Sequence, residues 1–236
     1  MPTVLLVRHG RTGANASGVL AGRSPGVGLD DHGRTQAATL AEQLAGLPLV
    51  RVVTSPLERT VATAQALVGV GGSAAVPRPA VLHDDRLLEC DYGEWTGRTI
   101  KELGKEPAWK TVQNHPSAVV FPGGESLRAV QHRAVEAVRE HDAAVAAEHG
   151  PAALWVAVSH GDVIKSLLAD ALGTHLDTFQ RIVVDPCSVS VVSYAPLRPF
   201  VLRTNGSGLG LEGLVPPART RRRRASSDAV VGGGAG

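Results

Sequence analysis

The chain has 236 residues, of which 43% are hydrophobic and 3% aromatic, and its formal net charge at pH 7 is +2. This length suits one sizeable domain, and the low aromatic content predicts a core built from Val, Leu, Ala and Ile. So small a net charge gives no global field that would indicate nucleic-acid binding. The sequence isoelectric point, near 8.7, owes much to an arginine run close to the C-terminus.

The cysteines and the N-terminus both favour a cytoplasmic protein. Cys90 and Cys187 match neither a metal-ligand spacing nor a CxxC motif, so two free thiols and no zinc site are expected. The first apolar run, residues 4–7, is too short for a signal peptide and follows no cationic segment. The sequence has no run of about 18 apolar residues. We therefore expect a cytoplasmic location and no membrane partner.

The N-terminal half of the sequence predicts strands that alternate with helices. Residues 4–7 form a short apolar run typical of a strand buried on both faces, and Ala37, Leu40, Ala41 and Leu44 recur at helical spacing. The elements expected here are a strand at 4–7, a helix at 33–45, a strand at 50–54, a helix at 57–68, a flexible connection at 69–75 and a short strand at 80–83. Such alternation predicts a parallel sheet.

The C-terminal half begins with a segment that has no clean period. Residues 97–123 contain Pro107, Pro116 and Pro122, and we interpret them as a covering insertion. The elements expected after it are a long helix at 125–148, a buried strand at 154–158, a helix at 163–172 and closing strands at 188–194 and 200–203, which would form a hairpin around 196–199.

These elements predict one α/β domain over 1–205, with three layers (α/β/α) around a mostly parallel sheet. Residues 206–236 are rich in Gly, Pro, Ser and Ala and have too little apolar periodicity to pack, so we predict a disordered tail. The arginines of this tail, Arg219 and 221–224, lack interleaved aromatic residues, and no nucleic-acid partner is expected. The sequence does not decide between a monomer and a homo-oligomer.

Three of the predicted strands lead to residues that can bind an anion. Arg8 and His9 follow the first strand, Arg59 lies in the first turn of the helix after the second, and His160 follows the third. Ligands of open α/β sheets bind beyond the carboxyl ends of the strands. Because guanidinium groups are permanently charged, bidentate donors, Arg8 and Arg59 are expected to bind a phosphomonoester dianion.

His9 is the preferred nucleophile, because a neutral imidazole can attack phosphorus in line and Gly10 would leave room for the phosphate. His160, which Gly161 follows, would donate a hydrogen bond to the transferring phosphoryl group. A leaving alkoxide needs a proton, which Glu89 could deliver. Other acids of the same region are the alternatives to Glu89, namely Asp84, Asp85, Asp91 and Glu94.

Four motifs, in this order, resemble those of the histidine phosphatase superfamily, in the branch similar to cofactor-dependent phosphoglycerate mutases and their phosphatase relatives. They are 8–12 (RHGRT) with Asn15, 55–64 (SPLERTVATA), 88–97 (LECDYGEWTG) and 159–161 (SHG). The resemblance covers roughly residues 3–204 and implies a phosphoglycerate mutase-like fold.

The same resemblance implies roles for individual residues and a small phosphorylated substrate. His9 would be phosphorylated, and Glu89 would serve as acid and base. Phosphate would be bound by a set of residues, namely Arg8, Asn15, Arg59, His160 and Gly161. No metal or other cofactor is implied, so we expect a metal-independent enzyme.

One departure from the family pattern bears on the reaction. Mutases of this family carry a longer insertion with a Trp-Arg-Arg-Ser-Tyr stretch, whereas residues 109–111 here read Trp-Lys-Thr. This favours a phosphomonoester hydrolase over a phosphomutase. A catalytically inactive phosphoryl-ligand sensor is a third alternative, which the intact motifs disfavour. Lys165 is expected to face solvent, and Trp95 and Trp109 are expected to pack rather than to bind a ligand.

Overall fold

The structure is a computed structural model that describes residues 2–70, 78–195 and 197–207. Across these residues a six-stranded sheet has the order β3-β2-β4-β1-β5-β6. The strands are β1 (Thr3–Arg8), β2 (Leu49–Thr54), β3 (Val81–His83), β4 (Leu154–Ser159), β5 (Val189–Tyr194) and β6 (Pro199–Gly206). The pairings among β1, β2, β3 and β4 are parallel, whereas β5 pairs antiparallel with β1 and β6.

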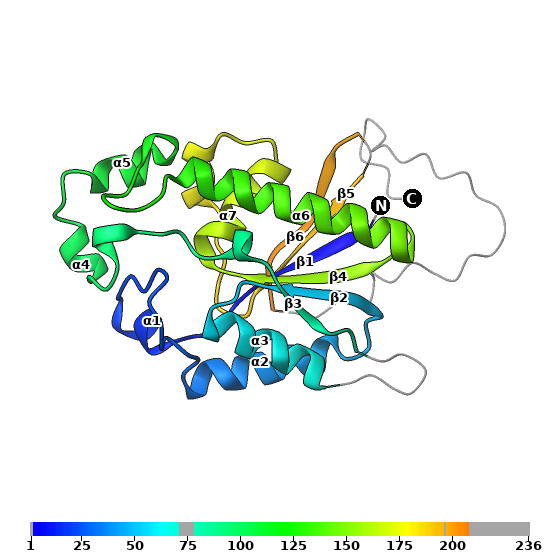
Figure 1. Cartoon of the computed structure of the whole chain (residues 1–236). Helices are drawn as coiled ribbons and strands as arrows, with labels where there is room; N and C mark the ends of the chain where they lie inside the picture. Colours follow the sequence, from blue (N-terminus) through cyan, green and yellow to red (C-terminus); the bar gives the residue numbers. More distant parts are fainter. Residues whose placement is uncertain (1, 71–77, 196, 208–236) are drawn as a thin grey trace.

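Helices cover both faces of the sheet, with α6 and α7 on one side and α2 and α3 on the other (Figure 1). The α-helices are α1 (Gly13–Ser17), α2 (Asp31–Leu44), α3 (Glu58–Gly69), α4 (Ile100–Leu103), α5 (Trp109–Asn114), α6 (Leu127–His149) and α7 (Gly161–Ala171). Short 3-10 helices complete the list: η1 (Asp85–Leu87), η2 (Gly93–Trp95), η3 (Pro116–Ala118) and η4 (Leu176–Arg181). The predicted three-layer α/β/α fold with a mostly parallel sheet is confirmed.

Aliphatic residues make up most of the core, as the composition predicts, although the side covered by α6 and α7 also buries aromatic residues such as Phe179 and Tyr194. All residues of the central strand β4 are buried, and so are Leu40, Ala41 and Leu44 on the inner face of α2. The largest exception is Trp155, whose indole N–H donates to the buried Asp142 carboxylate at 3.0 Å. Burying this indole is tolerable because its polar atom has a partner.

The predicted elements occur within a few residues of their expected bounds, and capping explains one shift. Helix α6 begins at Leu127 rather than at residue 125, because the Ser126 side chain accepts a hydrogen bond from the Ala129 N–H. The closing hairpin of β5 and β6 is present and reaches Gly206, one residue past the expected domain end. The predictions for 71–75 and for the tail beyond Ser207 lie outside the described residues.

The segment 97–123 lies at the end of the molecule where the parallel strands end, together with α1 (Figure 1). It contains α4, α5 and η3. A capping box of Thr99 and Glu102 starts α4. The segment thus lies over this end of the sheet, and its interpretation as an insertion stays a prediction. Separately, no helix of the described residues is long and apolar enough to cross a membrane.

Candidate active site

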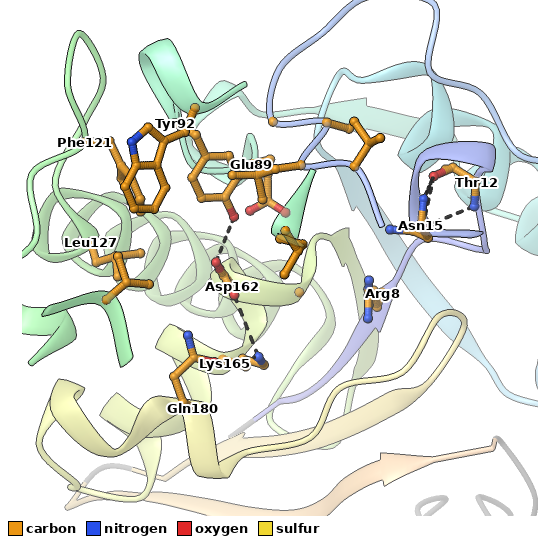
Figure 2. A pocket seen from close by; sticks show the side chains of 18 of the residues that line it. Arg8, Thr12, Asn15, Glu89, Tyr92, Phe121, Leu127, Asp162, Lys165 and Gln180 are labelled. Carbon is orange, nitrogen blue, oxygen red and sulfur yellow. Dashed lines mark hydrogen bonds and ion pairs between the residues drawn. The ribbon is translucent and has the colours of Figure 1, made fainter. Parts of the chain in front are cut away.

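A cavity of about 360 Å³ lies at the carboxyl ends of β1 and β4, under the segment 97–123 (Figure 2). Its volume is within the range of about 300–1,000 Å³ usual for small-molecule pockets. Most of the residues predicted for the site line it, namely Arg8, His9, Asn15, Arg59, Glu89 and Gly161. His160 is fully buried beside His9, with 5.2 Å between the two ring centroids.

His9 follows the last residue of β1 and is held in one orientation. Its Nδ1–H donates to the Gly10 carbonyl oxygen at 2.7 Å, so Nε2 is the atom with the free electron pair. Burial, followed by the charge of Arg59, lowers the pKa of His9 to about 3. The imidazole is therefore neutral near pH 7, as a nucleophile must be.

Gly10 also lets the loop after β1 lie close to α2. A Cβ at Gly10 would lie 2.6 Å from the Gly33 carbonyl oxygen, and a Cβ at Gly33 would lie 2.0 Å from the Arg11 carbonyl oxygen. The loop after β1 thus packs backbone to backbone on the first turn of α2. Asp30, the N-cap of α2, accepts from the Arg11 Nε at 2.8 Å. These contacts fix the backbone beside His9.

The two arginines of the site are each anchored by one nitrogen and leave another unpaired. Arg8 Nη1 donates to the Val184 carbonyl at 2.6 Å, and Arg59 Nη2 donates to the Gly22 carbonyl at 2.7 Å. The buried Arg8 Nε and Arg59 Nη1 have no partner among the described residues. A buried donor left unpaired costs about 1–3 kcal/mol, so both are suited to a bound anion.

His160 offers a third donor of the same kind. Its Nε2 lies 2.8 Å from the Ser55 hydroxyl, and its buried Nδ1 has no partner in the described part of the chain. When the Ser55 hydroxyl donates to Nε2, Nδ1 carries the proton. Burial and then Arg59 lower the pKa of His160 well below its ordinary value, so the imidazole is neutral near pH 7.

Glu89 is the predicted acid, and its side chain is buried in the wall of the cavity. One carboxylate oxygen accepts from the Cys90 backbone N–H at 2.9 Å. Burial, and next the negative charge of Asp162, raise the pKa of Glu89 to about 7. Glu89 can therefore hold a proton near neutral pH. The alternative acids do not line the cavity: Asp84, Asp85, Asp91 and Glu94.

Asn15 also lines the cavity, and it is oriented by its own helix. Its Oδ1 accepts from the N–H and the hydroxyl of Thr12 at 3.1 and 3.0 Å, in the capping box that starts α1. The amide nitrogen of Asn15 is thereby the atom left to donate to a ligand.

Residues that the sequence prediction missed form a second polar group in the cavity. The Tyr92 hydroxyl donates to Asp162 Oδ2 at 2.8 Å, and Lys165 Nζ donates to Gln180 Oε1 at 3.1 Å. The expectation that Lys165 faces solvent was wrong, because its side chain is only 20% exposed and lines the cavity. Lys165 follows Gly161 by four residues and so lies one helical turn further along α7, on the same face. This spacing is the sequence signal for its place in the cavity.

The remaining wall of the cavity is apolar. Trp95 and Trp109 stack with 6.1 Å between ring centroids, and Phe121 packs edge-on against Trp95. Both tryptophans pack as predicted, yet they also line the cavity. Cys90 is buried, and burial raises the pKa of its thiol, so it is a poor nucleophile. The described residues hold no group of three metal-binding side chains.

Two histidines, two arginines and a buried carboxylic acid thus lie together at the carboxyl edge of an α/β sheet. The family model of the histidine phosphatase superfamily (branch 1) matches residues 4–206. The chain belongs to this superfamily, and the resemblance of its four motifs is thereby confirmed.

Relatives of this chain include phosphatases and probable mutases. Phosphoserine phosphatase 1 of Hydrogenobacter thermophilus is 30% identical over 87% of this chain and 92% of that protein. A probable phosphoglycerate mutase of Klebsiella pneumoniae is 32% identical over 82% of this chain and 86% of that protein. Among solved structures, a mycobacterial glucosyl-3-phosphoglycerate phosphatase has a TM-score of 0.75 and 26% identity, covering 86% of this chain and 98% of its own.

Proposed function

We propose that this protein is a metal-independent phosphomonoester hydrolase that acts through a phosphohistidine on His9. The observation that carries the proposal is that three buried donors of the predicted site have no partner among the described residues: Arg8 Nε, Arg59 Nη1 and His160 Nδ1. A transferring phosphoryl group has three peripheral oxygens that need such donors. The neutral His9 imidazole lies beside them with Nε2 free.

In the first step, the Nε2 electron pair of His9 attacks phosphorus while the bond from phosphorus to the leaving oxygen breaks. Glu89 gives its proton to that oxygen, so the product leaves as an alcohol. Arg8 and Arg59 balance the charge that spreads over the phosphoryl oxygens. His160 donates a further hydrogen bond to them.

In the second step, the Glu89 carboxylate takes a proton from a water molecule as that water attacks the phosphohistidine. The bond from phosphorus to Nε2 breaks, inorganic phosphate forms, and both His9 and Glu89 return to their starting states. A pKa of about 7 suits Glu89 to give a proton in one step and take one in the next.

A phosphomutase is the alternative, because the relatives include probable phosphoglycerate mutases. In that reaction a second substrate molecule would take the phosphoryl group in place of water. The segment that would have to hold such a substrate carries Lys110, which is exposed and does not line the cavity. This favours hydrolysis.

The test is a turnover assay with p-nitrophenyl phosphate and a panel of alkyl phosphates, run with and without a chelator. We expect phosphate release that survives chelation, and an acid-labile, base-stable phosphoenzyme in the wild type. His9→Ala should abolish both signals, whereas His32→Ala, which changes an exposed histidine, should retain them. Fast isomerisation of a phosphoglycerate without phosphate release would show a mutase instead. Loss of activity that one divalent metal restores would contradict metal independence.

A further inference from the structure

Two polar side chains of the cavity take no part in the proposed phosphoryl chemistry. Lys165 comes from α7 and Gln180 from η4, and both line the cavity. The Lys165 ammonium has three contacts: it donates to Gln180 Oε1 at 3.1 Å, pairs with Asp162 Oδ1 at 3.8 Å and lies 5.7 Å from the centroid of the Phe179 ring. Two separate elements thus bring these side chains together at one point of the wall.

The pair presents hydrogen-bond donors to the cavity. Because Gln180 Oε1 already accepts from Lys165, the amide nitrogen of Gln180 is the group left to bind a ligand. The ammonium has three protons and uses one on Gln180. Its distance to Asp162 Oδ1 is 3.8 Å, which is longer than a hydrogen bond. The pair therefore has N–H groups left to donate to a ligand, and one of its members carries a positive charge.

The pair lies in the same cavity wall as Asp162, the carboxylate that interacts with the proposed acid Glu89. Asp162 connects the two regions, because its charge raises the pKa of Glu89 while its Oδ1 lies 3.8 Å from Lys165 Nζ and its Oδ2 accepts from the Tyr92 hydroxyl. Figure 2 shows Lys165 and Gln180 across Asp162 from Glu89, away from Arg8. A leaving group whose oxygen takes the Glu89 proton can extend from there past Asp162 to the pair.

We propose that Lys165 and Gln180 bind a carboxylate on the leaving group, so that the substrates are phosphate monoesters of small hydroxy acids. The Lys165 ammonium offers a charge-assisted donor and the Gln180 amide N–H offers a neutral one. A carboxylate has two oxygens that can accept them. Neither donor is needed by the phosphoryl group, which Arg8, Arg59 and His160 serve. This inference rests on the proposed hydrolase function.

The experiment compares two pairs of substrates, each of which differs in its carboxylate. The first pair is 3-phosphoglycerate and glycerol 3-phosphate, and the second is phosphoserine and phosphoethanolamine. We expect the wild type to prefer the carboxylate member of both pairs in kcat/KM. Lys165→Met should lower this preference by about 10- to 100-fold, the size expected for a lost hydrogen bond to a charged group. Gln180→Glu should lower it too, because a second carboxylate would repel the substrate.

Lys105→Met serves as the matched control, because it removes an exposed lysine that does not line the cavity. It should keep the wild-type preference. The ratio between the two members of a pair is the decisive readout, since a general loss of folding lowers both members equally. An equal loss for both members in Lys165→Met, or no preference in the wild type, would overturn the inference. Failure of the hydrolase proposal would look different, because p-nitrophenyl phosphate, which has no carboxylate, would then give no His9 phosphoenzyme.

Discussion

Glu89 is the residue whose surroundings set the proposed acid-base chemistry, and leaving-group basicity gives a way to test it. An alkyl phosphate expels a basic alkoxide that needs a proton, whereas p-nitrophenyl phosphate expels a stable phenolate. Glu89→Gln should therefore slow phosphoenzyme formation from alkyl phosphates by about 10²- to 10⁴-fold and from the aryl ester much less. Single-turnover measurements of both substrates decide the point.

The matched control for this variant is Glu94→Gln, which changes an exposed acid of the same segment. It should leave both rates near those of the wild type. Dephosphorylation should slow for both substrates in Glu89→Gln, because the same carboxylate acts as the base toward water. An equal loss of phosphorylation with the alkyl and aryl substrates would mean that Glu89 positions the substrate instead.

Asp162 allows a second test, through the pH dependence of the reaction. Glu89 must be protonated to act as an acid, so kcat/KM for an alkyl phosphate should fall as the pH rises through about 7. The charge of Asp162 raises this pKa, while Arg59 and Arg8 lower it. Asp162→Asn should therefore move the falling limb of the profile to lower pH. A limb that stays in place would show that Asp162 does not tune Glu89.

The residues that the sequence predicted for the site are those that stand in short motifs next to strand ends. Arg8 ends β1, and His9 and His160 directly follow β1 and β4, so their approach to one another was predictable. The neighbours that complete the cavity were not predictable in the same way. Gln180 lies on a 3-10 helix without any motif, and it meets Lys165 only because η4 packs on α7.

At the scale of elements, the loop after β1 depends on α2. The Gly33 Cα leaves no space for a side chain, because a Cβ there would lie 2.0 Å from the Arg11 carbonyl oxygen. Gly33→Ala should destabilise the fold by about 1–3 kcal/mol and displace the backbone beside His9. Displacement of a reacting group by about 1 Å can cost up to about 100-fold in rate, so kcat should fall as well.

Denaturant unfolding and steady-state kinetics measure the two effects of Gly33→Ala. The control is Gly69→Ala, because Gly69 ends α3 and a Cβ there meets nothing within 4 Å. That variant should differ from the wild type by less than about 1 kcal/mol. Equal stabilities of the two variants would show that the loop and α2 can move apart enough to accommodate a Cβ at residue 33.

Hydrophobic periodicity predicted the long elements well, because each buries one face or both. It missed α1 and α4, which are short and are started by capping boxes at Thr12 and Thr99 rather than by an apolar stripe. The sequence also did not predict the order of the strands in the sheet. β1 pairs along its whole length with β4, although about 150 residues separate them.

At the scale of the whole molecule, the extent of the domain stays a prediction that truncation can test. Asn205 belongs to β6, and its side chain accepts from the Asp185 N–H at 2.7 Å, so a cut should fall beyond Ser207. The composition of 208–236 predicts little apolar burial. Removal of 208–236 should leave kcat within about twofold and the melting temperature nearly unchanged. A deletion from Pro199, which also removes β6, is the control and should unfold the protein.

Two buried neutral histidines give the whole fold a dependence on acid. Burial lowers the pKa of His9 to about 3 and that of His160 well below its ordinary value. In the unfolded chain both would take up a proton near pH 6.5. The unfolded state therefore binds more protons than the folded state below that pH. The contribution of these two neutral histidines to the free energy of unfolding is fully present above about pH 6.5 and is lost as the pH falls toward 3.

The size of this acid effect can be measured with one substitution and one control. Proton uptake by His9 in the unfolded chain should lower the free energy of unfolding by about 2 kcal/mol at pH 5. In a domain of this size that lowers the melting temperature by about 4–8 °C. His9→Asn keeps an amide that can donate to the Gly10 carbonyl but does not titrate. Its melting temperature should fall by about 4–8 °C less between pH 7 and pH 5 than that of His32→Asn, which changes an exposed histidine. Equal falls in the two variants would mean that His9 takes up its proton without unfolding, and then it would not be the neutral nucleophile near pH 5.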